Sequence, residues 1–147
     1  METDLSKKIR RFGKILVLDK DPESGAYLEK MLAEWGYKAS TFSSPDESLN
    51  CLRQNRHDLV VLDACFDDMA LPRLILDLKS ARKEAAVLVI NASNDSDELQ
   101  EALEAGAADC FSAPLNPAEL SAAIRRLLSR GSRGTPLKMS NYSSMSL

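Results

Sequence analysis

Three polar residues, Asp19, Asp63 and Asn91, each stand directly after a run of apolar residues. If those runs are parallel strands, their carboxyl ends meet at one edge of a sheet, where ligands of such sheets bind. Two carboxylates that converge there can hold a hard cation such as Mg²⁺, or one of them can attack phosphorus as a nucleophile. The sequence therefore predicts an acidic pocket around Asp19 and Asp63.

The strands that would position this pocket stand out by composition. Segments 14–18, 59–62 and 86–90 are rich in Leu, Ile, Val and Ala, which is typical of parallel strands buried on both faces. Segment 38–42 has mixed polarity and is expected at or near a sheet edge. A short last strand is expected at 109–112.

Helical patterns separate these strands. Apolar residues recur at helical spacing between positions 27 and 35, and Gly36 is placed to end that helix. Ser44 and Glu47 form a capping pair that starts the next helix. Three more helices are predicted, from Leu71 onward, from 94–97 to Gly106, and from Asn116 onward.

Five strands that alternate with five helices predict the α/β class. Short right-handed crossovers place the helices on both faces of the sheet, so we expect a flavodoxin-like, three-layer αβα fold. Its sheet is expected to hold five parallel strands in the order 2-1-3-4-5.

The length of 147 residues suits one domain with tails. We assign 13–130 to the domain and 1–12 to a basic N-terminal arm. Residues 131–147 are rich in Ser and Gly and are interpreted as a flexible tail or the beginning of a linker.

The overall composition excludes several classes of protein. A net charge of −3 gives no general attraction for DNA, so no direct nucleic-acid binding by this domain is expected. No segment is apolar enough for secretion or for a membrane span. Cys51, Cys65 and Cys110 are far apart and lack metal-ligand spacing, which favours a reduced, cytoplasmic location.

Two cysteines and the single histidine lie outside these patterns. We expect Cys65 to be a small packed residue and Cys110 to lie in the core or half-buried. His57 lacks an acidic or cysteine partner in any motif and is expected in a surface loop.

Five segments resemble, in order and in separation, the receiver domains of two-component response regulators. They are ILVLDKDP, DLVVLD, VLVINAS, EAGAADCFSAP and the Asn-Pro start of the last helix, and the resemblance covers residues 13–130. It implies that Asp63 is the phosphoacceptor, modified by a histidine kinase. It also implies an acidic pocket at Asp19, Lys20 and Asp63, with Mg²⁺ beside the phosphoryl group.

Several positions depart from the pattern of that family. Lys20 stands where a second acidic residue usually binds the metal, and Asn91 replaces a hydroxyl residue. Ala113 replaces the lysine that contacts the phosphoryl oxygens, and Cys110 replaces an aromatic residue. The resemblance therefore implies that any Mg²⁺ is held weakly, through Asp19, Asp63 and Cys65.

These departures weaken the groups that neutralise charge during phosphoryl transfer. An ammonium at Lys20 lies near the metal position, so Mg²⁺ affinity is expected to fall. An alternative hypothesis makes Lys20 a substitute for the metal, pairing with Asp19 or Asp63.

Our first hypothesis is an atypical receiver module of a phosphorelay that acts mainly through protein–protein contacts and is not an enzyme. The second is a receiver that is still phosphorylated on Asp63, with weakened Mg²⁺ dependence. The third is a flavodoxin-like small-molecule binder. Expected partners are a histidine kinase or another signalling protein, and a second copy bound through the last two helices and the strand between them. No membrane partner is expected.

Overall fold

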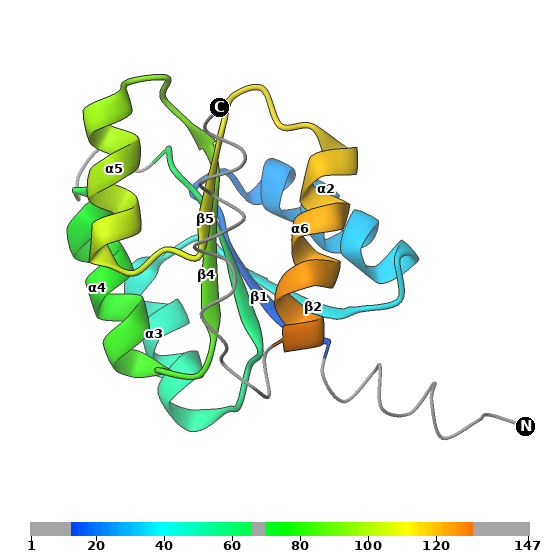
Figure 1. Cartoon of the computed structure of the whole chain (residues 1–147). Helices are drawn as coiled ribbons and strands as arrows, with labels where there is room; N and C mark the ends of the chain where they lie inside the picture. The colour runs from blue at the N-terminus through cyan, green and yellow to red at the C-terminus, as the bar shows by residue number, and fades with distance from the viewer. Residues whose placement is uncertain (1–12, 66–69, 131–147) are drawn as a thin grey trace, which may run out of the picture.

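The computed structural model describes residues 13–65 and 70–130, and within them a single parallel sheet forms the centre of the fold (Figure 1). The strand order is β2-β1-β3-β4-β5, and every neighbouring pair is parallel. The strands are β1 (Lys14–Leu18), β2 (Lys38–Phe42), β3 (Leu59–Asp63), β4 (Ala86–Ala92) and β5 (Asp109–Ser112). The predicted fold class and strand order are confirmed, with β2 at the edge.

Within the described residues, five helices cover the sheet in two layers. They are α2 (Pro22–Glu34), α3 (Pro45–Gln54), α4 (Leu71–Ala81), α5 (Ser96–Ala105) and α6 (Pro117–Arg130). Helices α2 and α6 lie on one side of the sheet, and α3, α4 and α5 lie on the other (Figure 1). No helix in the described ranges is both long and apolar enough to cross a membrane.

The core has two halves because successive side chains of a strand point to opposite faces. In β1, Leu16 and Leu18 pack with the α3–α4–α5 layer, whereas Ile15 and Val17 pack with α2 and α6. All four side chains are fully buried. The continuous apolar runs of the sequence therefore serve both layers at once.

The predicted helix ends are found where the sequence placed them. Ser44 is the N-cap of α3, and its Oγ faces the amide of Glu47 at 3.5 Å. Gly36 follows the C-cap of α2 with φ 98°, and Gly106 ends α5 with φ 122°. Both glycines occupy the left-handed region that disfavours other residues.

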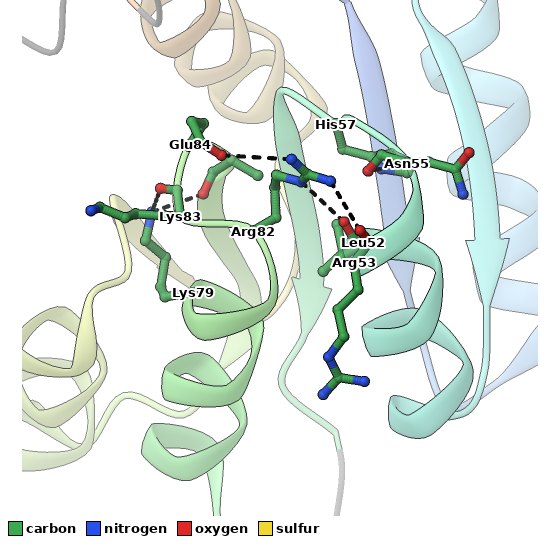
Figure 2. Close-up of polar contacts among 9 residues, drawn as sticks. Leu52, Arg53, Asn55, His57, Lys79, Arg82, Lys83 and Glu84 are labelled. Atoms are coloured by element: carbon green, nitrogen blue, oxygen red, sulfur yellow. Dashed lines mark hydrogen bonds and ion pairs between the residues drawn. The ribbon is translucent and has the colours of Figure 1, made fainter.

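At the amino ends of the strands, Arg82 joins α3 to α4 (Figure 2). Its Nε donates to the carbonyl of Leu52 at 3.0 Å and its Nη2 donates to that of Arg53 at 3.4 Å. These carbonyls belong to the last turn of α3, where no intrahelical donor is available. Arg82 thus fixes the packing of two helices far from the predicted pocket.

His57 corrects the expectation of a surface histidine, because its side chain is only 1% exposed. Its Nδ1 lies 3.2 Å from the carbonyl oxygen of Asn55 (Figure 2). Burial lowers the pKa of His57, and the cationic groups of Lys14 and Arg82 act in the same direction. The segment before β3 is therefore folded into the core rather than held in solvent.

Candidate functional site

The predicted pocket exists as a cleft of about 320 Å³ at the carboxyl ends of the strands. β1 and β3 are neighbours there, and the chain leaves β1 for α2 on one face of the sheet and leaves β3 for α4 on the other (Figure 1). Ligands bind at such switch points in folds of this kind. The residues that line the cleft are Asp19, Asp21, Glu23, Ser24, Tyr27, Leu28, Asp63, Asn91 and Leu115.

Asp63, the predicted phosphoacceptor, is the last residue of β3 and is 4% exposed. Its Oδ1 accepts a hydrogen bond from the backbone amide of Cys65 at 3.0 Å. Its Oδ2 accepts a hydrogen bond from the Asn91 side-chain amide at 2.9 Å. Both carboxylate oxygens are thus engaged within the chain.

Asn91 reaches Asp63 from an irregular part of the neighbouring strand. The pairing of β4 with β5 shifts register between Val89 and Ala92. Within that shift Asn91 has φ 57°, a left-handed conformation that Asn tolerates better than most residues.

Asp19 follows β1 and is 2% exposed. Its Oδ1 accepts a hydrogen bond from the backbone amide of Asp21 at 3.0 Å. Among the described residues, no group donates a hydrogen bond to its buried Oδ2. Burial raises the pKa of Asp19 to about 6, and the negative charges of Asp63 and Asp21 contribute in the same direction. Asp19 and Asp63 are therefore two close acids of which one resists ionisation.

The other predicted pocket residues are not all brought together. Lys20 is exposed and Ala113 is exposed, and neither lines the cleft. Cys110 is half-buried, as expected, and burial raises the pKa of its thiol to about 11.

Cys65 corrects a second expectation, because it is exposed rather than packed. Its backbone amide faces the pocket through the bond to Asp63.

The sequence pattern missed part of the cleft wall. Tyr27 and Leu28 belong to the apolar pattern that predicts this helix, and the structure places both in the wall of the cleft, with Tyr27 63% exposed. Asp21 caps α2 by accepting the amide of Glu23 at 3.1 Å, and it also lines the cleft. The Asp-Pro pair at the start of α2 was the available signal for that cap.

The cleft offers oxygen donors for a hard cation. The buried, orphaned Oδ2 of Asp19 beside a second carboxylate is the type of oxygen site that Mg²⁺ prefers. In the described ranges, however, no three His, Cys, Asp or Glu side chains are grouped to hold a metal ion. The residues fit a cation held through the carboxylates of Asp19 and Asp63.

Known proteins resemble this chain in sequence. Residues 15–125 match the family model of the response regulator receiver domain. The transcriptional regulatory protein PcoR of Escherichia coli is 30% identical over 117 residues, which cover 80% of this chain and 52% of PcoR. The chain thus spans about half the length of that curated relative.

Solved structures of receiver domains share the fold, and two of them illustrate the likeness. The beryllofluoride-activated NtrC4 receiver domain dimer has a TM-score of 0.74 at 21% identity and covers 81% of this chain and 98% of that one. The receiver domain of the sensor histidine kinase PA1611 from Pseudomonas aeruginosa, with magnesium in its active-site cleft, has a TM-score of 0.69 at 18% identity, with 80% and 98% covered. Because the family model matches most of the chain, the flavodoxin-type binder is set aside, and the protein belongs to the receiver domains of two-component response regulators.

Proposed function

We propose that this receiver signals mainly through protein contacts and accepts a phosphoryl group at Asp63 slowly or not at all. The observation that carries the proposal is the charge of the cleft. Four carboxylate residues, Asp19, Asp21, Glu23 and Asp63, are among its described lining residues, and none of those lining residues is a lysine or arginine.

Phosphoryl acceptance at Asp63 requires charge to be neutralised. A carboxylate oxygen of Asp63 would bond to phosphorus while the bond from phosphorus to the donor breaks, which is a bond to nitrogen in a phosphohistidine and a bond to oxygen in acetyl phosphate. The products are an acyl phosphate on Asp63 and the released donor. Such a transfer is driven by positioning and by nearby cations rather than by covalent chemistry of the protein. With Ala113 at the expected lysine position, this chain lacks one cation that the family resemblance implies.

Mg²⁺ is the second source of positive charge. Asp19 and Asp63, with the backbone at Cys65, are the groups that would hold it, and when bound it would neutralise the phosphoryl oxygens. Lys20 stands in the sequence where the resemblance implies a second acidic residue after β1, so one metal-binding carboxylate is missing, which lowers the affinity for the ion. Lys20 is exposed, and its proposed pairing with Asp19 or Asp63 remains a prediction.

A second candidate function is a receiver that is still phosphorylated on Asp63. The retained Asp63 and the orphaned Asp19 oxygen favour it, because together they keep a nucleophile and one metal-binding carboxylate in place. In this case Mg²⁺ dependence is weakened rather than lost.

Incubation with acetyl phosphate and Mg²⁺, followed by intact mass measurement, separates the two functions. The first predicts no gain of a phosphoryl group, or a gain over hours. A gain within minutes that is abolished in Asp63→Asn would overturn it in favour of the second. Lys20→Asp with Ala113→Lys serves as the positive control, because it restores the acid and the lysine.

We propose that the protein signals through contacts made by its surface. We propose a histidine kinase or another signalling protein as partner, and self-association through α5, β5 and α6. Leu103 on α5 is 39% exposed there. Leu103→Glu should abolish self-association in sedimentation velocity, and a monomeric wild-type protein at high concentration would refute the dimer.

The remaining assignments are also proposals. We propose that the domain spans 13–130, with 1–12 as a basic arm and 131–147 as a tail or linker, although both terminal segments lie outside the described residues. We further propose that it has no enzymatic role beyond self-catalysed acceptance and loss of phosphate, and that it works in the cytoplasm.

A further inference from the structure

We infer that Asn91 is a built-in clamp on Asp63, which holds the carboxylate in a state that does not accept phosphorus. The inference rests on the proposed function and names the residue that imposes the block. It concerns the hydrogen bond from Asn91 Nδ2 to Asp63 Oδ2, 2.9 Å long, in the wall of the cleft.

Both carboxylate oxygens of Asp63 accept hydrogen bonds from within the chain. Oδ1 of Asp63 is bound by the amide of Cys65 and Oδ2 by Asn91, and the residue is 4% exposed. Of these donors, Asn91 is the one whose side chain lines the cleft. An oxygen that bonds to phosphorus loses charge and therefore loses much of its hydrogen bond to Asn91.

The backbone at position 91 has an unusual conformation. Its φ of 57° lies in the left-handed region, which Asn adopts readily and which is strained for β-branched residues. The register shift between Val89 and Ala92 sets this local geometry. The backbone therefore favours Asn at this site, and the amide is held on Asp63 rather than left to rotate.

The size of the effect follows from the charge of the acceptor. A hydrogen bond to a charged group stabilises a folded site more than a neutral one does, so losing it on attack slows acceptance by about tenfold to a hundredfold. Removing the amide should raise the rate by that factor.

Asn91→Gly is the sharpest variant, because glycine keeps the left-handed backbone and removes the amide. Asn91→Thr introduces a hydroxyl but strains the same backbone. Each is made in wild type and in Lys20→Asp/Ala113→Lys, and uptake from acetyl phosphate with Mg²⁺ is timed by intact mass. The Asp63→Asn variant in each background gives the rate of phosphoryl uptake that does not depend on Asp63.

The ratio of the rate of the Asn91→Gly variant to that of its parent tests the clamp, whereas the wild-type rate tests the proposed function. A rise of about tenfold or more on Asn91→Gly in the restored background supports the clamp. Equal rates in the restored background overturn it, even if wild-type uptake stays slow. Rapid wild-type uptake overturns the proposed function, and the ratio still decides on Asn91.

A second measurement does not depend on the folding of an Asn91 variant. In amide-detected NMR, the side-chain NH₂ signal of Asn91 should move on Asp63→Ala and stay in place on Glu23→Gln, an exposed acid of the same cleft. An Asn91 side-chain signal whose chemical shift is unchanged by Asp63→Ala would refute the clamp in solution. A signal that moves only on Asp63→Ala supports it.

Discussion

The Cγ2 methyl of Thr41 on β2 lies 2.5 Å from the position that a Cβ would take at Gly25 on α2. Gly25 is therefore required by close approach of the helix to the strand, since its own helical backbone would accept alanine. The Oγ1 hydroxyl of Thr41 donates to the Glu29 carboxylate, also on α2, at 2.5 Å, and lies 3.3 Å from the Gly25 carbonyl oxygen, so polar and steric contacts both hold the strand against the helix.

Gly25→Ala should destabilise the fold by about 1–2 kcal/mol, because overpacking costs more than the helix propensity of alanine returns. Thr41→Ser removes the clashing methyl and keeps the hydroxyl, so the double variant should recover most of that loss. Urea unfolding of wild type, the two single variants and the double variant measures the coupling. An unchanged midpoint for Gly25→Ala alone would contradict the close contact.

Asp19→Asn should stabilise the protein by about 1–2 kcal/mol at pH 7.5 in EDTA, because it removes a buried charge that repels Asp63. This figure allows for the screening of that repulsion by solvent. The folded-state pKa of Asp19, about 6, lies above its ordinary value of 3.8. The contribution of Asp19 to the free energy of unfolding of the wild-type protein therefore decreases as the pH rises from about 4 to 6. Asp19→Asn should lack that slope, whereas the exposed Glu101→Gln should keep it. Denaturant midpoints across the range measure both.

His57 should produce the opposite slope. Its pKa is lowered by burial in the folded protein, so the unfolded chain takes up a proton first as the pH falls below the ordinary value of 6.5. The contribution of His57 to the free energy of unfolding is fully present above that pH and is lost progressively below it. The charged groups that face His57 include Lys14, Asp58 and Arg82. In an Asp19→Asn background, where the opposing slope is gone, His57→Gln should flatten the fall of stability below about pH 6.5, and an unchanged fall would count against a buried neutral histidine.

Arg82→Ala should cost about 1–3 kcal/mol, because two carbonyls at the end of α3 lose their donors. Arg82→Lys should recover only part, since an ammonium lacks the planar fork of donors. Arg53 is an exposed arginine of the same region and provides the matched control. Thermal unfolding should rank the variants Arg53→Ala, Arg82→Lys and Arg82→Ala in order of increasing loss.

Arg126→Ala should also destabilise the fold, by about 1–3 kcal/mol, because it leaves the buried Asp109 without its partner. Arg126 Nη2 lies 2.8 Å from Asp109 Oδ2, and the Asp109 side chain is 8% exposed. The pairing within the chain holds α6 against β5. Asp109→Asn, which keeps an acceptor for the guanidinium, should cost less than Arg126→Ala in the same urea titration.

The fold was predictable because its signals are local and redundant. Each central strand is apolar on both faces, and Ser44, Gly36 and Gly106 mark helix ends by their own conformational preferences. His57 and Cys65 were not predictable in this way, because their burial depends on which distant elements cover them. Asn91 could be identified as unusual by type, yet its left-handed backbone arises from a register shift between two strands, which no single segment encodes.

The polar residues of the pocket all stand at or beyond the strand ends, whereas the two core halves are built from the apolar residues before them. Lys20 and Ala113 are exposed and contribute nothing to either half. Mutations could therefore accumulate at the reactive edge without lowering the stability of the scaffold. Such an architecture lets a lineage abandon chemistry first and keep a recognisable, well-folded binding surface for new uses.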